Sequence, residues 1–347
     1  MRHPVACRLF AAFLGGVSPM TAVDPITSVP APYPSFGSIE RLDPALDALL
    51  APDAKLEKLA EGFTWSEGPV WVRSAGHLLF SDVPENIVYR WKHDEGVSVF
   101  LTPSGFTGEH YDGRERGSNG LTLDAQGRLV LAQHGDRRVA RLNADQRSFT
   151  TLADRHEGRR FNSPNDLVFD RAGHLYFTDP PYGLARSAVR EIDVHGVYRV
   201  TPEGVVTLLT GEMERPNGLA LSPDERILYV ANSHPPRPVI MAYSLDSDGR
   251  ISGGRTFFDM AHLVAPDRPG LPDGLKVDQE GNLWATGPGG VLILSPDGRH
   301  LGTLRTGQAT ANCAFGEDGS VLYITADSIL GRIRTRVRGT GFPDHSR

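Results

Sequence analysis

The chain is 347 residues long, enough for two ordinary domains or for one large repeat fold. Its 38 Gly and 26 Pro residues favour short strands joined by many turns. The net charge is −6, so the chain has no excess of basic residues, and neither nucleic acid nor an anionic membrane surface is expected as a partner. Two cysteines, Cys7 and Cys313, are too few for a disulfide framework.

The first 22 residues have the order of features of a secretory signal. Two arginines precede a short apolar run, Leu9 to Val17, and small residues follow near Ala22. The run is too short to span a bilayer, and no other segment approaches transmembrane length. We therefore expect a signal peptide over residues 1–22 and a periplasmic or secreted protein. The alternative is an N-terminal extension without a clean cleavage site, in which case the protein is cytoplasmic.

Residues 23–52 predict a linker and a short helix. Residues 23–37 are Pro-rich, which favours an extended segment without a core of its own. Asp43 and Pro44 are typical of an N-cap followed by Pro at the first helical position. Leu46 and Leu49 would then form the apolar side of a short amphipathic helix.

A sixfold repeat organises residues 53–337. Each copy is a polar side chain ending in oxygen, a short apolar strand, a tight turn and a second apolar strand. The copies begin at Glu67, Asn119, Asn165, Asn217, Asp273 and Asn312, at spacings of 39 to 56 residues. This period, with alternating apolar residues and turn signals, is typical of a β-propeller. We predict an all-β fold, a six-bladed β-propeller, followed by a C-terminal tail over residues 338–347.

A propeller must close its ring. Ile329 to Val337 alternates arginines with apolar residues, as a half-buried strand does. We expect this strand to pair with an early strand around Lys55 to Ala60 in one shared blade. Long insertions at residues 102–118 and 262–272 lead into two of the repeats, and such loops shape pockets.

The residues that begin the repeats should lie near the axis, at one end of each inner strand, and converge on one mouth of the channel. All six side chains end in a carboxylate or amide oxygen. Oxygen-only sets suit Ca²⁺ and, less exclusively, Mg²⁺ or Mn²⁺. The carboxylates of Glu67 and Asp273 would neutralise a divalent ion, and amide oxygens would complete its coordination.

A simpler interpretation exists for two of these positions. Asn-Gly is the commonest pair in tight hairpins, so Asn119-Gly120 and Asn217-Gly218 can be read as turn residues. Glu67 does not fit that interpretation, because Glu is a poor turn residue. For the set as a whole, the metal interpretation is therefore favoured.

Four motifs at blade spacing resemble the SMP-30/gluconolactonase/LRE-like family, in its bacterial gluconolactonase type. They are Glu67-Gly68-Pro69-Val70-Trp71, Ser163-Pro164-Asn165-Asp166, Arg215-Pro216-Asn217-Gly218-Leu219 and Leu271-Pro272-Asp273-Gly274. The resemblance runs from about Asp43 to about Ile333 and implies a divalent ion in the central channel of a six-bladed propeller.

The resemblance also implies the site residues. The implied metal ligands are Glu67, Asn165, Asn217 and Asp273, although Asn165 could instead lie nearer the substrate. The vertebrate type has a substrate-contacting Arg at the place of Ser163, so sugar recognition here must be arranged differently.

The implied activity is that of a metal-dependent carboxylic-ester hydrolase. Its small-molecule substrate would be a lactone, typically an aldonolactone such as glucono-1,5-lactone. Ca²⁺ is the first choice of ion, with Mg²⁺, Mn²⁺ or Zn²⁺ as alternatives. The ion would polarise the lactone carbonyl while a carboxylate activates water. Asp273 is the first candidate for the base, and His134, at a strand end of blade two, is the alternative base or a substrate hydrogen-bond donor.

The candidate substrate-binding residues are Asn119, Asn165, His134 and Asp179. We interpret Asp179 as a pocket wall or supporting residue, with a plain turn cap as the alternative. The chain has no Gly-x-Ser-x-Gly, His-Glu-x-x-His, Walker or Cys-x-x-Cys motif. A phosphotriesterase-like hydrolase using the same ion, or a non-catalytic binding propeller with a structural metal, are the other functions considered. The oligomeric state, monomer or dimer, is left open.

Overall fold

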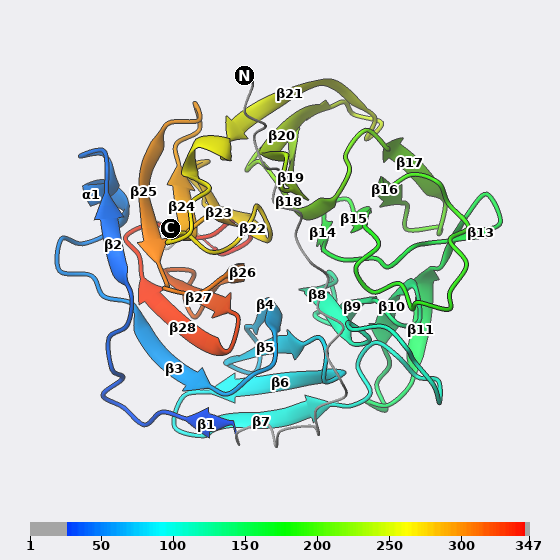
Figure 1. Cartoon of the computed structure of the whole chain (residues 1–347), viewed down its shortest axis with the longest axis horizontal. Helices are drawn as coiled ribbons and strands as arrows, with labels where there is room; N and C mark the ends of the chain where they lie inside the picture. The colour runs from blue at the N-terminus through cyan, green and yellow to red at the C-terminus, as the bar shows by residue number, and fades with distance from the viewer. Residues whose placement is uncertain (1–25, 344–347) are drawn as a thin grey trace, which may run out of the picture.

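The structure, a computed structural model, describes residues 26–343. Six antiparallel sheets of four or five strands stand around one axis, and the blue N-terminal strands lie beside the red C-terminal strand (Figure 1). The prediction of an all-β, six-bladed propeller is confirmed. The expected signal peptide over residues 1–22 lies outside the described residues.

Each blade is built outward from the axis. The innermost strands are β4 (Ser66–Val72), β8 (Ser118–Leu123), β14 (Leu167–Phe169), β18 (Pro216–Leu221), β22 (Leu275–Val277) and β26 (Thr310–Gly316). The second strands are β5 (His77–Asp82), β9 (Leu129–Gln133), β15 (Leu175–Asp179), β19 (Ile227–His234), β23 (Leu283–Gly287) and β27 (Val321–Ala326). The second strands are almost wholly buried, because both of their faces pack against neighbouring blades.

The outer half of each blade is more exposed. The third strands are β6 (Ile87–Lys92), β10 (Arg138–Leu142), β16 (Gly196–Val200), β20 (Arg237–Leu245), β24 (Gly290–Leu294) and β28 (Ile329–Arg334). The fourth strands are β7 (Gly96–Leu101), β11 (Phe149–Ala153), β17 (Val206–Thr210), β21 (Ile251–Asp259), β25 (His300–Arg305) and β3 (Glu57–Glu61). A small hairpin, β12 (Arg155–His156) with β13 (Arg159–Arg160), and a 3-10 turn, η1 (Ala261–Leu263), lie in connections.

The ring closes where the sequence predicts. Strand β3 from the N-terminal part pairs antiparallel with β28, with Leu330 opposite Ala60 and Arg332 opposite Glu57. Blade six is therefore completed by residues more than 260 positions away in the chain. This pairing makes the first and last parts of the propeller one sheet, so the blades cannot separate without breaking it.

The segment before β3 is more than a linker. Its residues are extended as expected, but β1 (Thr27–Ser28) pairs with β3, and β2 (Ser38–Arg41) adds a fifth strand to blade five beside β25. Tyr33 and Phe36 also pack against the buried clusters of the propeller, which the prediction of an extended linker without a core of its own did not include. Helix α1 (Leu46–Leu49) follows. The helix begins two residues later than the Asp43-Pro44 signal predicts. The Asp43 carboxylate still accepts a hydrogen bond from the Ala45 amide, directly before the helix.

Irregularities in the inner strands turn particular side chains toward the axis. The pairing register shifts after Glu67 in β4, after Ser118 in β8, after Pro216 in β18 and after Thr310 in β26. Such bulges re-aim side chains and are common beside functional sites. The residues that begin four of the repeats lie at or next to these points.

The turn interpretation of the two Asn-Gly pairs was wrong. Asn119-Gly120 lies inside β8 and Asn217-Gly218 inside β18. Gly218 is needed there because a Cβ would collide with the carbonyl oxygen of Asp273 in the next blade. Gly120 has the same relation to blade three. Glycine thus lets adjacent inner strands approach closely at the axis.

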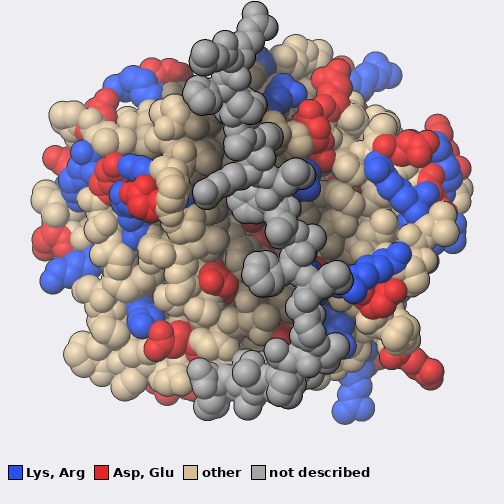
Figure 2. Space-filling view, in the orientation of Figure 1, with Lys and Arg blue, Asp and Glu red and all other residues tan. Residues whose placement is uncertain are grey.

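The surface carries mixed charge. On the face drawn in Figure 2, acidic and basic side chains are interspersed around the rim and form no broad basic area. Among the described residues, no helix is long and apolar enough to cross a bilayer.

Candidate functional site

The six residues that begin the repeats lie at one end of the central channel, where five are buried and Asp273 is half-buried. Contacts between blades connect them. Asn312 Nδ2 lies 3.3 Å from Glu67 Oε2, which joins blade six to blade one. Asn165 Nδ2 lies 3.5 Å from His134 Nε2, which joins blade three to blade two. The predicted convergence is observed, whereas the roles of the individual residues remain predictions.

Glu67 is held in a buried acidic cluster. Its Oε2 accepts a hydrogen bond from the Gly68 amide at 2.8 Å. Burial raises the pKa of Glu67 to about 8; the Gly68 hydrogen bond opposes this rise, and the charge of Asp166 from blade three adds to it. A cation here would offset both the desolvation and the repulsion.

Asp273 faces the same region with a free oxygen. Its Oδ1 is buried and has no hydrogen-bond partner among the described residues. Burial raises the pKa of Asp273 well above its usual range, and the charges of Glu67 and Asp166 raise it further. A hydrogen bond from the Asn217 side chain acts in the opposite direction. Glu67 and Asp273 therefore repel one another when both are ionised, as two carboxylates do that share a site.

Amide oxygens extend this oxygen-rich set. Asn119 Oδ1 and Asn165 Oδ1 are buried without a partner, like Asp273 Oδ1. An unsatisfied buried oxygen costs about 1–3 kcal/mol, so three such atoms at one mouth indicate a ligand. Within residues 26–343 no three His, Cys, Asp or Glu side chains are grouped as a metal site, so the donors would be two carboxylates and several amides. This set fits Ca²⁺ and, less exclusively, Mg²⁺ or Mn²⁺.

Asn312 differs from the other amides because its oxygen is already occupied. Its Oδ1 accepts hydrogen bonds from the Cys313 amide at 2.9 Å and from Lys276 Nζ at 3.3 Å. Its Nδ2 points to the carboxylates of Glu67 and Asp166. Both donors and both acceptors require this orientation of the amide. Asn312 thus supports the acidic cluster, although the sequence grouped it with the oxygen donors.

His134 directly follows β9 of blade two and is fully buried. Its Nδ1 lies 3.4 Å from Glu115 Oε2, and its Nε2 faces the Asn165 amide. The backbone of Gly183 packs directly on the imidazole, since a Cβ there would overlap the His134 side chain. The ring is therefore fixed, with one nitrogen toward a carboxylate and the other toward the mouth.

Asp179 is buried and holds the loop before Asn165, in line with its interpretation as a supporting residue, and a substrate-binding role for it stays a prediction. Its two oxygens accept hydrogen bonds from the backbone amides of Asn162 and Ser163, each at 2.8 Å. With no exposed surface, the carboxylate is fully used in holding the loop that carries Asn165. Burial raises the pKa of Asp179 to about 7, against the effect of these hydrogen bonds. Asp82 holds the loop before Glu67 in the same way.

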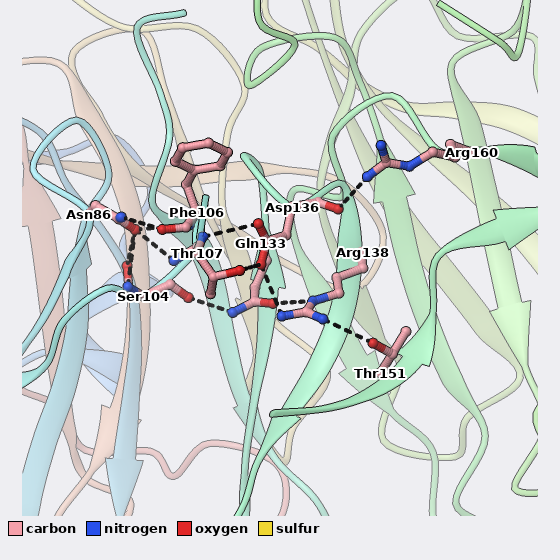
Figure 3. Close-up of polar contacts among 10 residues, drawn as sticks. Asn86, Ser104, Phe106, Thr107, Gln133, Asp136, Arg138, Thr151 and Arg160 are labelled. Atoms are coloured by element: carbon pink, nitrogen blue, oxygen red, sulfur yellow. Dashed lines mark hydrogen bonds and ion pairs between the residues drawn. The ribbon is translucent and has the colours of Figure 1, made fainter. Parts of the chain in front are cut away.

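The insertion over residues 102–118 is anchored firmly at its base. Figure 3 shows Asn86 bonded to the backbone of Phe106 and Asp136 bonded to Thr107. Further along, the Tyr111 hydroxyl lies 2.7 Å from the Gly183 carbonyl oxygen and 2.9 Å from that of Glu115, and its one hydrogen is shared between them. The insertion therefore brings Glu115 to His134 on a fixed support, in agreement with the expectation that this loop shapes the mouth.

Comparisons with known proteins agree with this geometry. The family model described as SMP-30/Gluconolactonase/LRE-like region matches residues 65–328. The chain belongs to this family. A gluconolactonase from Zymomonas mobilis subsp. mobilis is 44% identical over 314 residues, which is 88% of each chain. A solved gluconolactonase structure from Xanthomonas campestris has a TM-score of 0.76 and 36% identity, covering 89% of this chain and 97% of the other. Rabbit (Oryctolagus cuniculus) regucalcin is 28% identical, covering 77% of this chain and 84% of its own.

Several residues at this mouth were missed or left without a role in the sequence analysis. Gly follows Asn119, Asn217 and Asp273, whereas Asp166 follows Asn165. This difference between the repeats is visible in the sequence and could have drawn attention to Asp166. Lys276 reaches Asn312 from further along its innermost strand, and a charged residue on such a strand could also have been noticed in the sequence. Glu115 and Tyr182 lie in irregular loops, where no repeat marks them.

A large cavity lies elsewhere. It has a volume of about 1200 Å³ and is lined by the far ends of the inner strands and the turns that follow them, including Lys276 and Phe315. None of the unpartnered oxygens borders it. We therefore place the candidate site of this family member by its chemistry, at the opposite mouth.

Proposed function

We propose that the protein hydrolyses an aldonolactone, such as glucono-1,5-lactone, to the aldonic acid with the help of a divalent cation. The observation that carries this proposal is the group of unpartnered buried oxygens, Asp273 Oδ1, Asn165 Oδ1 and Asn119 Oδ1, beside Glu67. The gluconolactonase names of the relatives at 44% and 36% identity support the substrate class.

The residues that would hold the cation are Glu67, Asn165, Asn217 and Asp273. Their oxygens come from four different blades, so the closed ring keeps them in place. When bound, the cation would supply electrophilic stabilisation of the negative charge that develops on the lactone carbonyl oxygen. Ca²⁺ is the first candidate, because all the donors are hard oxygens.

Asp273 is the proposed base that takes a proton from the attacking water. Its buried Oδ1 has no partner among the described residues and can accept that proton. His134 is the alternative, with Nε2 facing the mouth and Nδ1 toward Glu115. We propose that His134 and the Asn119 and Asn165 amides hydrogen-bond the substrate.

A pH-stat assay tests the proposal. Glucono-1,5-lactone and a panel of small lactones are assayed with EDTA and after readdition of Ca²⁺, Mg²⁺, Mn²⁺ or Zn²⁺. We expect lactone opening above the spontaneous rate, lost in EDTA and restored by at least one ion. Asp273→Asn should lower kcat by about 10²-fold or more if Asp273 is the base, whereas His134→Gln should then have the smaller effect.

The same assay separates the other functions. A non-catalytic propeller with a structural metal would leave the spontaneous rate unchanged, and EDTA would alter only the melting temperature. A phosphotriesterase-like hydrolase would turn over a phosphotriester faster than any lactone of the panel. Either result would overturn the proposed lactonase.

A further inference from the structure

Tyr182 presents a buried hydroxyl to the candidate site. Its ring is partly exposed, but Oη is buried; the Ser233 side chain is its polar neighbour, and no hydrogen bond of good geometry forms within residues 26–343. Burial raises the pKa of Tyr182 to about 12, and among the charges acting on it are Asp273 and Arg215. The neighbouring Gly183 packs directly on His134, which places the turn that carries this hydroxyl beside the acidic mouth. The hydroxyl is a neutral hydrogen-bond donor at physiological pH.

The turn that carries Tyr182 is fixed from two sides. Ser163 Oγ donates to the Pro180 carbonyl at 2.6 Å and accepts from the Gly183 amide at 3.0 Å. From the insertion, Tyr111 Oη donates to the Gly183 carbonyl at 2.7 Å. Tyr182 is thus held between two anchored residues, so its unpartnered hydroxyl is a fixed feature of the mouth.

Ser163 explains why the turn is there. Its backbone amide is held by Asp179, and this frees its hydroxyl to bind both ends of the turn. In blade four, the backbone amide of Arg215 bonds to Asn232 Oδ1 at 2.9 Å in the same manner, so Arg215 occupies the equivalent place one blade further on. The Arg215 side chain is exposed and forms no ion pair or side-chain hydrogen bond among the described residues.

Resting on the proposed function, we propose that Tyr182 is a specificity-determining residue, whose hydroxyl donates a hydrogen bond to a ring hydroxyl of the lactone. Arg215 lies at the rim on the same side and is available to a second hydroxyl. A polyhydroxylated lactone would thereby satisfy a donor that is otherwise buried without a partner. A lactone without hydroxyl groups would leave that donor unsatisfied, so the site should discriminate against it.

The test compares two substrates in Tyr182→Phe. This variant should lose roughly threefold to tenfold in kcat/KM for glucono-1,5-lactone, the range expected for one neutral hydrogen bond. It should keep its kcat/KM for δ-valerolactone, which has the same ring without hydroxyl groups. Equal losses on both substrates, or no loss on either, would overturn the inference.

Tyr243→Phe is the matched control. The Tyr243 hydroxyl is likewise buried with one polar neighbour, Thr210, and no hydrogen bond of good geometry, but it belongs to the apolar cluster of blade four. Removing it should change neither kcat/KM. A substrate-selective loss in this control as well would show that the effect comes from packing, and the inference would fail.

A binding measurement separates this inference from the proposed function. Titration calorimetry with 1,5-anhydroglucitol, which has the hydroxylated ring without a carbonyl, needs no turnover. We expect the wild type to bind it and Tyr182→Phe to bind it several-fold more weakly. If neither lactone is hydrolysed but this difference is found, the proposed function fails and the role of Tyr182 stands. If the wild type does not bind the analogue, or both proteins bind it equally, the role of Tyr182 is refuted.

Discussion

Asn312 of blade six donates from Nδ2 to Glu67 Oε2 of blade one across 3.3 Å, at the point where the ring of blades closes. The same amide accepts from Lys276 Nζ, a residue of blade five. The Asn312 side chain therefore links the Lys276 ammonium group to the buried Glu67 carboxylate and joins three blades. The proposed metal centre and the closure of the propeller depend on this amide together.

Replacing Asn312 should show that dependence. Asn312→Leu removes one hydrogen-bond partner each from Glu67, Lys276 and the Cys313 amide, so we expect a loss of about 2–3 kcal/mol in the free energy of unfolding. Asn312→Asp keeps the acceptor for Lys276 but adds a negative charge beside Glu67. Its loss should therefore be restored in part by Ca²⁺, and that of Asn312→Leu should not. Urea unfolding with and without Ca²⁺ measures both, and an equal response of the two variants to Ca²⁺ would contradict the interpretation.

The metal-free protein should become less stable as the pH rises. The pKa of Glu67 is raised from 4.5 to about 8, so the folded protein holds a proton that the unfolded chain releases. The stability that this proton contributes is fully present below about pH 4.5 and is lost as the pH rises through 8. Asp179, with its pKa raised to about 7, acts in the same direction. In EDTA, the melting temperature should fall by several degrees between about pH 5 and pH 8.5, and Glu67→Gln should fall less.

Much of this arrangement could be predicted because a repeat places equivalent residues at equivalent points. The spacing of the copies predicts the blades, and the alternation in Ile329 to Val337 predicts the closing strand. The repeat does not determine what a side chain meets from the next blade. Asn312 and Asn165 are equivalent in sequence, but only Asn312 has a lysine and a backbone amide at its oxygen.

Short edge strands and irregular loops are the other elements that the sequence did not predict. Strands β1 and β2 are two and four residues long, too short for a periodic signal, and they form because an open strand edge is available beside them. Tyr182 could not be assigned for a related reason. Its hydroxyl reaches the mouth because Ser163 and Tyr111 fix the turn, and both contacts join segments far apart in the sequence.

Removal of either central carboxylate should weaken cation binding. Glu67→Gln and Asp273→Asn each remove one of the two negative charges proposed to neutralise the ion, so the Kd for Ca²⁺ should rise at least about tenfold by titration calorimetry. Glu109→Gln is the matched control, because Glu109 is an exposed carboxylate of the insertion over residues 102–118. Unchanged Ca²⁺ binding in both Glu67→Gln and Asp273→Asn would refute the proposed ligand set, whatever the activity of these variants.

The pairing of β3 with β28, here called the seam, closes the ring of blades. Its stability should depend far more on Arg332 than on Arg334. Arg332 bonds to Glu57 Oε2 at 2.8 Å and to Glu317 Oε1 at 3.2 Å, and its guanidinium lies 4.9 Å from the centre of the Tyr33 ring. Its side chain is only 17% exposed, against 66% for Arg334 on the same strand. A partly buried, charged hydrogen-bond network is worth more than an exposed ion pair, because water competes less for it.

We therefore expect Arg332→Met to lower the free energy of unfolding by about 2 kcal/mol and Arg334→Met to change it by less than about 0.5 kcal/mol. Urea unfolding measures both. Because β3 and β28 hold the blades in one ring, the first variant should also weaken Ca²⁺ binding near its unfolding midpoint, when the seam opens before the rest. If the two variants lose equal stability, or if Ca²⁺ binding persists after the seam has opened, closure by Arg332 does not hold the metal site together.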